Sequence, residues 1–390
     1  WMDPGPASAA GAMHAIDAYF CAVVEANPGL RPRVGNPDEM ESNRLSRTLE
    51  RLKHRVSHPE GQVPESTHGA VITALNEEAV VSAALGNKGG INLVASYEAF
   101  AVKMLGAVRQ EIIFARHQAE AGRPPGWIGV PLVATSHTWE NGKNEQSHQD
   151  PGVGEALMGE MADVSRVLFP GDRNSALAAL EATFRARGQV WTLVVPKRPL
   201  PVRFTPEQAR RLVRDGAVRV SGSGDEPLQL VTTGGYQLAE ACKASLRLDR
   251  AGFPHSLVYL QEPTRFRVPR DAREMQSLPP PERLTELFPE DTAARVFITH
   301  TRPGPFAGVV QPLLMDPVRS PVLGFLNQGG TLDVDGMLFT NRCTWAHLAA
   351  AAATALGESP ERLLDDAEMA AVLGEGDPGA VLQPHPAPGA

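Results

Sequence analysis

The feature that most constrains the fold is a regular alternation between two kinds of segment from residue 69 to residue 195. Short apolar runs rich in β-branched residues alternate there with longer segments whose apolar residues recur with the period of a helix. This alternation is typical of a parallel sheet whose strands are joined by crossover helices. We therefore expect an α/β domain with strands at 70–75, 131–135, 165–169 and 190–195 and helices at 77–85, 97–117 and 174–187.

A second set of α/β elements follows a break in composition. Residues 221–227 are polar and contain glycine, as is typical of a domain boundary. Beyond this break we expect strands at 228–232, 255–260 and 295–300 and a closing alanine-rich helix at 345–356. The sequence thus predicts the α/β class, with two consecutive three-layer domains and mainly parallel sheets. The expected division is an N-terminal extension (1–28), a first domain (29–200), a linker (201–226), a second domain (227–365) and a disordered tail (366–390).

Composition narrows the classes of partner. The 390 residues carry a net charge of −8, with 21% charged and 42% hydrophobic residues, and no basic stripe that would bind nucleic acid or an anionic membrane. No apolar run reaches the roughly 20 residues needed to cross a bilayer. The three cysteines, Cys21, Cys242 and Cys343, form no close pair, which indicates a reducing compartment. We expect a cytoplasmic protein that binds neither nucleic acid nor membrane.

The densest polar cluster is the sequence SHTWENGKNEQSHQDPG at 136–152, directly after the expected strand 131–135. Ligands of open parallel sheets bind beyond the carboxyl ends of the strands, so this segment is either a ligand site or a solvated loop, and its spacing leaves both open. His137, His148 and Asp150 fit no common zinc pattern. The loop also lacks the nucleophile elbow of a hydrolase.

Three further clusters have an ordinary structural interpretation when taken alone. Glu77 and Glu78 follow Asn76 at the start of an expected helix, where carboxylates are stabilised by the helix dipole. The sequence NPDEMESNR at 36–44 is typical of a capped helix start at the surface. Lys197 would be an exposed lysine after a strand. Residue types and spacing therefore do not assign a function to these positions.

Taken in order, however, the clusters resemble the phosphoketolase family. The loop at 136–152 is similar to the family signature, in which Ser-His and Ser-His-Gln-Asp-Pro-Gly frame an asparagine at the spacing of Asn144. Residues 36–39 and 42–45 are similar to its Gly-Pro-Asp-Glu and Ser-Asn-Arg-Leu element. Several ordered motifs are far more specific than any one of them.

Other segments extend this resemblance. Residues 96–100 are similar to the Ser-Tyr-Glu-Ala-Phe helix start of the family, and Glu77 stands at the glutamate of its Ser-Glu-His motif. Residues 297–300 and 329–331 resemble its C-terminal domain more loosely. The resemblance covers roughly residues 34–356 and implies a transketolase-like pyrimidine-binding domain followed by a transketolase C-terminal-like domain.

The resemblance implies roles for individual residues. Glu77 would hydrogen-bond the aminopyrimidine ring of thiamine diphosphate, with Tyr97 and Phe100 also binding this cofactor, and His148 would act with Glu77 in catalysis. Two cations among hydroxyl and amide donors also suit a phosphate oxyanion. The residues expected to bind phosphate or substrate are Ser42, Arg44, Tyr97, His137, Asn141, Asn144, His148 and Lys197.

The chain also departs from the family motifs. Glu140-Asn141-Gly142-Lys143 stands where the family has Arg-Gln-Asp-His, and Glu78 stands where it has a histidine. These changes indicate altered contacts to the sugar, whereas the phosphate-binding and cofactor-activating residues are retained.

A further departure concerns the cofactor's diphosphate. The family's Gly-Asp-Gly motif, which with a downstream asparagine holds Mg²⁺, does not occur in this sequence, and we expect Met2 to be the natural start. We therefore expect a separate diphosphate-binding-domain subunit to supply the metal ligands, in a two-plus-two heterotetramer.

The function implied by the resemblance is that of a thiamine-diphosphate-dependent aldehyde-lyase. With its partner, the chain would cleave a ketose or ketose phosphate and release the two-carbon unit with inorganic phosphate as an acyl phosphate. Two alternatives stay open: transketolase-like transfer of the two-carbon unit to an aldehyde, and a non-catalytic scaffold subunit.

Overall fold

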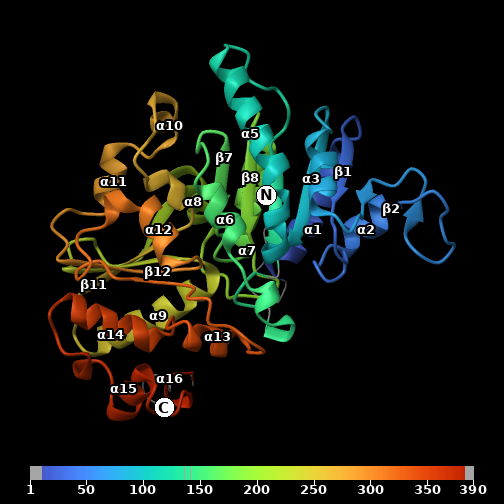
Figure 1. The fold of residues 1–390 in the computed structure, drawn as a ribbon. Coiled ribbons are helices and arrows are strands. Elements are labelled where there is room, and N and C mark those ends of the chain that lie inside the picture. Colours follow the sequence, from blue (N-terminus) through green and yellow to red (C-terminus); the bar gives the residue numbers. More distant parts are fainter. Residues whose placement is uncertain (1–10, 136, 141, 383–390) are drawn as a thin grey trace. The chain divides into compact units, whose positions relative to one another are not determined.

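The computed structural model of the chain describes residues 11–135, 137–140 and 142–382, and Figure 1 shows its ribbon. Backbone contacts divide these residues into two compact units. The first unit contains the described residues up to 140, residues 147–214 and residues 269–278, and the second unit contains the remainder. Among the described helices, none has the length and apolar character that a bilayer crossing requires.

The first unit is built on a parallel sheet of eight strands. Their order is β3-β2-β4-β1-β5-β6-β8-β7, and every pairing within the sheet is parallel. The strands are β1 (Arg31–Gly35), β2 (His54–Arg55), β3 (Glu65–Ser66), β4 (Val71–Ile72), β5 (Gly90–Tyr97), β6 (Val130–Thr135), β7 (Ser165–Leu168) and β8 (Val190–Val194).

The adjacent inner strands β5 and β6 are buried almost throughout, as expected for a parallel sheet covered on both faces. The sequence analysis predicted β6 but neither β1 nor β5. The run from Ile91 to Val94, between two glycines and a helix start, is the signal that indicates β5.

Helices connect these strands. The helix predicted at 77–85 is confirmed at the predicted bounds, whereas the one predicted at 97–117 is divided by a 3₁₀ turn at residues 102–104. The helices of this part are α1 (Ala12–Ala26), α2 (Ser46–Leu52), α3 (Glu77–Leu85), α4 (Glu98–Ala101), α5 (Leu105–Glu120), α6 (Gly152–Met158), α7 (Arg173–Arg185) and α8 (Pro206–Asp215).

The second unit contains a five-stranded sheet of order β13-β12-β10-β11-β9. Only β9 runs antiparallel to its neighbour among the described pairings of this sheet. Its strands are β9 (Ala217–Ser221), β10 (Leu228–Thr233), β11 (His255–Leu260), β12 (Ala294–Thr299) and β13 (Val322–Leu323). Its helices are α9 (Gly235–Arg250), α11 (Pro281–Leu287), α12 (Pro303–Val309), α13 (Val334–Thr340), α14 (Trp345–Ala355), α15 (Asp366–Leu373) and α16 (Gly379–Leu382).

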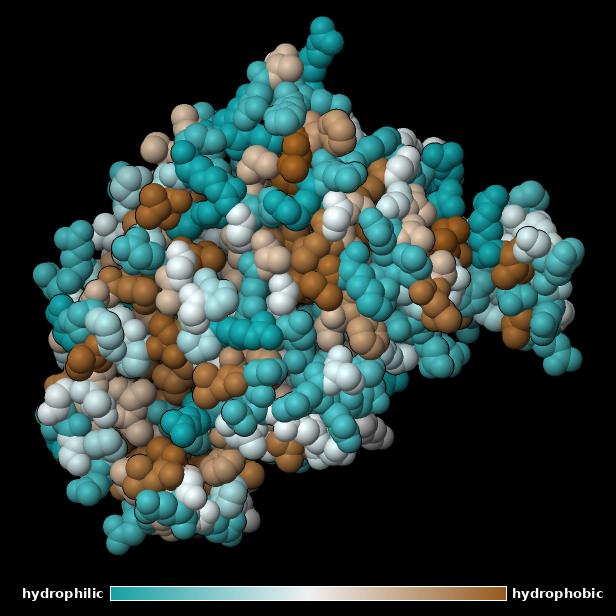
Figure 2. All heavy atoms as spheres, in the orientation of Figure 1, coloured by the Kyte–Doolittle hydropathy of each residue, from teal (hydrophilic) through white to brown (hydrophobic). Residues whose placement is uncertain are grey.

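Three segments have more structure than the sequence suggested. The expected N-terminal extension contains α1, whose Met13, Ile16 and Phe20 are fully buried, so this amphipathic helix is part of the core. The expected linker at 201–226 contains α8 and β9, and the expected tail contains α15 and α16 before its last eight residues, which lie outside the described part. On the face drawn in Figure 2, hydrophilic residues predominate and hydrophobic residues form scattered patches.

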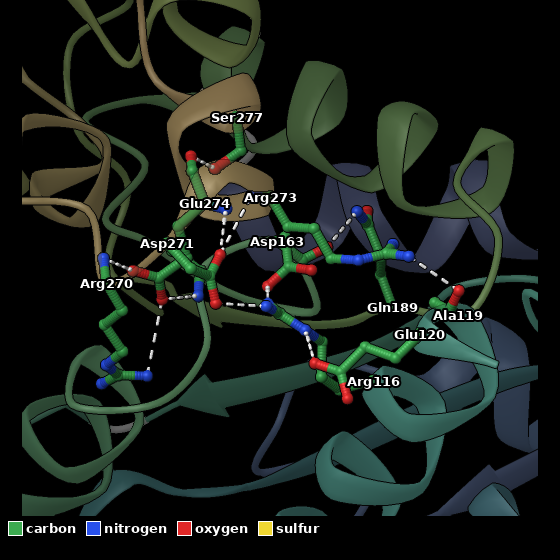
Figure 3. A network of polar contacts seen from close by, with 11 residues as sticks. Arg116, Ala119, Glu120, Asp163, Gln189, Arg270, Asp271, Arg273, Glu274 and Ser277 are labelled. Carbon is green, nitrogen blue, oxygen red and sulfur yellow. Dashed lines mark hydrogen bonds and ion pairs between the residues drawn. The ribbon is translucent and has the colours of Figure 1, made fainter. Parts of the chain in front are cut away.

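Residues 269–278, which include α10 (Ala272–Ser277), belong to the first unit although they follow β11 in sequence. Figure 3 shows the polar network that holds them. The Arg116 guanidinium pairs with Glu120 at 2.8 Å, with Asp163 at 2.6 Å and with Asp271. The buried Glu274 carboxylate accepts the backbone N–H of Ala162 at 3.0 Å. The buried Arg116 cation and the buried Glu274 carboxylate thus hold residues 269–278 in the first unit.

Candidate functional site

The candidate site lies at the carboxyl-terminal edge of the eight-stranded sheet, where its parallel strands end. Parallel strands end at the same edge, and ligand sites of open α/β sheets form there. Five strands reach this edge, and the segments that follow them carry the side chains expected to bind ligand. These segments follow β1, β4, β5, β6 and β8. The strand ends are in register, since Gly35 is paired with Val94, Tyr97 with Thr135 and Ala134 with Val194.

Glu77 is the first residue of α3. The Asn76 side chain caps this helix by accepting the N–H of Ala79 at 2.9 Å. The Glu77 residue is 7% exposed, and Lys103 Nζ lies 3.2 Å from its Oε1. The helix terminus and Lys103 both stabilise a negative charge at this buried position. The Glu77 carboxylate can therefore accept a hydrogen bond from another donor, which would either share it with Lys103 or replace Lys103 as its partner.

The rings of Tyr97, Phe100 and His148 lie close together at the candidate site. The Tyr97 and Phe100 rings are stacked with centroids 6.1 Å apart, and the His148 ring meets the Phe100 ring edge-on at 4.7 Å. The His148 Nδ1 lies 2.8 Å from the Ser147 hydroxyl. Tyr97 is the last residue of β5, Phe100 lies in α4 just after it, and His148 follows β6. The tertiary fold thus brings together two motifs that are about 50 residues apart in sequence.

Tyr97 also joins the residues expected to bind phosphate. Its hydroxyl lies 2.5 Å from the Ser42 hydroxyl, and Lys197 Nζ lies 4.7 Å from the centre of its ring. Burial lowers the pKa of Lys197, the Arg44 cation lowers it further, and the Glu140 and Asp38 carboxylates oppose both effects. The exposed Arg44 adopts a positive φ of 60°, a left-handed conformation that is uncommon for a side chain of this size. Two cations and two hydroxyl groups are thus grouped in the first unit.

Asp38 is a residue of this cluster that the sequence analysis did not assign to the site. Its Oδ2 atom is buried and has no hydrogen-bond partner among the described residues. Burial raises the pKa of Asp38, and the Glu77 charge adds to this, whereas the backbone N–H of Tyr97 and the charges of Lys197 and His148 oppose it. Its position in the Gly-Pro-Asp-Glu-like segment is the sequence signal that could have indicated it.

Asp38 and Tyr97 also line an open pocket of about 520 Å³. The pocket contains the pair formed by His54 Nδ1 and the Thr73 hydroxyl at 2.8 Å. Leu75, two residues before Glu77, contributes a side chain that is 94% exposed. The remaining lining residues are Pro37, Glu39 and Met40.

Buried polar contacts hold the segments that carry the site. Asn43 Nδ2 donates to Asn36 Oδ1 at 3.1 Å, and the Thr135 hydroxyl donates to Asn43 Oδ1. The fully buried Glu98 accepts the backbone N–H of Thr138 at 2.8 Å and its hydroxyl at 3.1 Å. These bonds link the segments after β1, β5 and β6, which a sequence pattern cannot pair.

Not every predicted residue joins the cluster. His137 is buried, with 2% exposure, two residues beyond the end of β6. Asn144 is exposed and belongs to the second unit. Asn141 lies outside the described residues. The structure therefore groups Ser42, Arg44, Tyr97, His148 and Lys197, with Glu77 and Phe100 beside them.

Comparison with known proteins shows which proteins this chain resembles. Residues 14–186 match the family described as D-xylulose 5-phosphate/D-fructose 6-phosphate phosphoketolase. The chain is thus similar to phosphoketolases over this segment. It is 27% identical over 256 residues to the probable phosphoketolase 2 of Lactiplantibacillus plantarum, a match that covers 62% of this chain and 32% of that protein. The chain thus spans about a third of the length of this phosphoketolase, and the resemblance to phosphoketolases that the motifs predicted is confirmed.

Solved structures share the fold. The transketolase from Leishmania mexicana has a TM-score of 0.68 at 18% identity, and the match covers 93% of this chain and 47% of that one. A protein described as a split gene transketolase, inactive beta4 tetramer, has a TM-score of 0.62 at 16% identity, and the match covers 89% of this chain and 99% of that one. The predicted transketolase-like α/β fold with mainly parallel sheets is confirmed.

Proposed function

We propose that this chain is the pyrimidine-binding subunit of a heteromeric, thiamine-diphosphate-dependent enzyme of the phosphoketolase type. Together with a partner, it cleaves a ketose or ketose phosphate and releases the two-carbon unit with inorganic phosphate as an acyl phosphate. The observation that carries the proposal is the grouping of a buried carboxylate, Glu77, with the cationic cluster around Tyr97 at one edge of the sheet.

Glu77 is suited to hold a protonated ring nitrogen. Its carboxylate is buried at a helix N-terminus, where a hydrogen bond is strengthened by the low local polarity. Lys103, which pairs with it, has a side chain that is 61% exposed and can turn into solvent when another donor arrives. The fit to an aminopyrimidine is completed by the stacked Tyr97 and Phe100 rings. When bound, thiamine diphosphate would supply the carbon nucleophile, and this chain's residues would orient the ring and hold its proton.

The cluster of Ser42, Arg44, Tyr97 and Lys197 is suited to bind a phosphate group. Arginine can engage two oxygens of the anion, and lysine and the two hydroxyl groups provide further donors. Inorganic phosphate as a co-substrate and the phosphate of a sugar present the same chemistry to this pocket. The family description names D-xylulose 5-phosphate and D-fructose 6-phosphate, and these are the donors that we propose first.

A partner chain would complete the site. The split gene transketolase that shares this fold is matched over 99% of its length, so a chain of this extent occurs as a separate subunit in a related assembly. Leu75, exposed beside Glu77, provides apolar surface that a partner could cover. We propose that a diphosphate-binding subunit supplies the Mg²⁺ ligands and that the two subunits assemble as a two-plus-two heterotetramer.

Reconstitution with a separate diphosphate-binding subunit tests the proposal. Formation of acetyl phosphate from fructose 6-phosphate and phosphate, trapped as the hydroxamate, should require both chains. Glu77→Gln should lower the rate by at least a factor of about 100, because the amide cannot replace the carboxylate at the ring nitrogen. Glu25→Gln, which removes a carboxylate with a 69% exposed side chain from α1 of the same unit, is the matched control and should keep the activity.

The products separate the proposal from its alternatives. Transfer of the two-carbon unit to an aldehyde without consumption of phosphate would establish the transketolase reaction instead. Full activity of Glu77→Gln would leave this chain as a scaffold. Calorimetry gives an independent test of the partner: the chain alone should bind thiamine diphosphate weakly, and tight stoichiometric binding without a partner would contradict the split site.

A further inference from the structure

Glu140 makes a pair of backbone contacts close to Lys197. Its Oε2 accepts the backbone N–H of Lys197 at 3.0 Å, and its Oε1 accepts the backbone N–H of Arg198 at 3.0 Å. Both oxygens of one carboxylate thus bind two successive amides of the segment that follows β8. Such charge-assisted hydrogen bonds are stronger than those between neutral groups, and a bidentate arrangement fixes direction as well as distance.

Glu140 itself is held by a rigid segment. Its backbone N–H donates to the carbonyl of His137 at 2.9 Å, and the preceding Trp139 is fully buried. Thr138 is anchored to the buried Glu98 through both its N–H and its hydroxyl. The carboxylate therefore links a fixed segment after β6 to the segment after β8.

The segment after β8 is the one that presents Lys197. The Lys197 ammonium lies over the Tyr97 ring, and the charged groups that act on it are Glu140, Arg44 and Asp38. A shift of the backbone at residues 197 and 198 would move the ammonium relative to the Tyr97 and Ser42 hydroxyl groups. The bond pair from Glu140 opposes this shift.

We propose that Glu140 is a positioning residue, which fixes the backbone at Lys197 and Arg198 and so directs the Lys197 ammonium into the anion pocket. This inference rests on the proposed function, because it requires that Lys197 binds a phosphate group. Glu140 stands where the phosphoketolase motif has an arginine, so the arrangement is a property of this chain that the motif does not supply.

The sign of the effect distinguishes positioning from simple charge. A carboxylate near an anion site repels the anion, so removing its charge would by itself strengthen phosphate binding. If positioning dominates, Glu140→Gln weakens binding, because an amide offers one acceptor oxygen and turns its NH₂ group towards the second N–H. We expect the phosphate dissociation constant to rise about tenfold.

Calorimetric titration of the full chain with inorganic phosphate tests this inference. Lys197→Met should abolish the binding, and Glu140→Gln should weaken it. Glu226→Gln is the matched control, since the Glu226 carboxylate also accepts two successive backbone N–H groups, from Ser223 at 2.7 Å and Gly224 at 2.8 Å, in the other unit. This control should bind phosphate like the wild type while losing a similar amount of thermal stability.

Two results would overturn the inference in different ways. Unchanged or tighter phosphate binding by Glu140→Gln, together with loss of binding by Lys197→Met, would reject positioning by Glu140 and leave the phosphate pocket standing. Absence of phosphate binding in the wild type, or equal binding by Lys197→Met, would reject the phosphate pocket and this inference with it. A pH series adds a second readout: loss of the Glu140 charge should move the alkaline decline of phosphate affinity to lower pH, because this charge opposes the lowering of the Lys197 pKa.

Discussion

Replacement of Arg116 by methionine tests whether the network of Figure 3 holds residues 269–278 in place. The Arg116 side chain is 5% exposed and pairs with three carboxylates, and methionine keeps most of its packing volume while removing the charge. The partners differ in burial: the side chains of Glu120 and Asp271 are 48% and 46% exposed, whereas that of Asp163 is 16% exposed. Water can therefore solvate the first two carboxylates after the change but reaches Asp163 poorly.

The magnitude follows from this difference. Breaking a fully buried ion pair by removing one partner costs about 3–5 kcal/mol, and exposed pairs contribute at most about 1 kcal/mol. With one of three partners left mostly buried and uncompensated, we expect Arg116→Met to lower the free energy of unfolding by about 2–3 kcal/mol. At a urea dependence of roughly 2 kcal/mol per molar, the unfolding midpoint should fall by about 1 M.

Urea unfolding followed by tryptophan fluorescence measures this change. Arg185→Met is the control, because Arg185 forms an i,i+4 pair with Glu181 and its side chain is 77% exposed, so its loss should cost less than about 0.5 kcal/mol. Adding Asp163→Asn to Arg116→Met should restore part of the stability, since it removes the uncompensated charge. The reasoning is refuted if Arg116→Met is no less stable than Arg185→Met, or if the second change destabilises the protein further.

Three further predictions concern the polar side chains of the site. Burial lowers the pKa of Lys197 below 10.5. The contribution of Lys197 to stability is therefore present above pH 10.5 and is lost as pH falls through the folded-state pKa. The melting temperature of Lys197→Met should accordingly vary less with pH between these two pKa values than that of the wild type. Burial raises the pKa of Asp38 above 3.8, so its contribution is present at lower pH and is lost as pH rises through the folded-state pKa. Asp38→Asn should accordingly melt higher than the wild type at neutral pH but not near pH 3, and an equal difference at both pH values would contradict this account. Tyr97→Phe removes the hydroxyl bound to Ser42 but keeps the stacked ring, so it should weaken phosphate binding by less than a factor of about 10, and calorimetry that shows no change would exclude the hydroxyl from the pocket.

Much of the fold could be predicted because its signals are local. The strand at 255–260 and the helix at 77–85 have the predicted bounds, since apolar periodicity and capping residues are written into short stretches of sequence. The strand β5 was missed although it is central, and α8 was missed within a segment rich in proline and arginine. For α8 the expectation followed average composition, whereas burial against neighbouring segments decided the structure. For β5 the apolar run from Ile91 to Val94 was a local signal that had not been used.

Several residues of the candidate site were proposed where a motif indicated them. Ser42, Arg44, Tyr97, His148 and Lys197 were assigned through the family resemblance, and the structure groups them in the first unit. Their roles in binding cofactor and phosphate stay predictions until ligands are measured. Asp38 and Lys103 were assigned to the site only from the coordinates, and Glu140, which the sequence showed only as a departure from the motif, gained its positioning role there. Their importance comes from charges and backbone groups that are distant in sequence.

The amino-acid sequence by itself determined the α/β class, the relation to phosphoketolases and the chemical types of the expected ligand-binding groups, because periodicity and ordered motifs are properties of neighbouring residues. Only the tertiary structure decided which of these groups meet. Parallel pairing of β1, β5, β6 and β8 brings their carboxyl ends to one edge, so that the Ser42 and Tyr97 hydroxyl groups, 55 residues apart, approach to 2.5 Å and the Glu140 carboxylate reaches the amide of Lys197 across 57 residues. Such distances depend on the register of the whole sheet, which no single segment encodes.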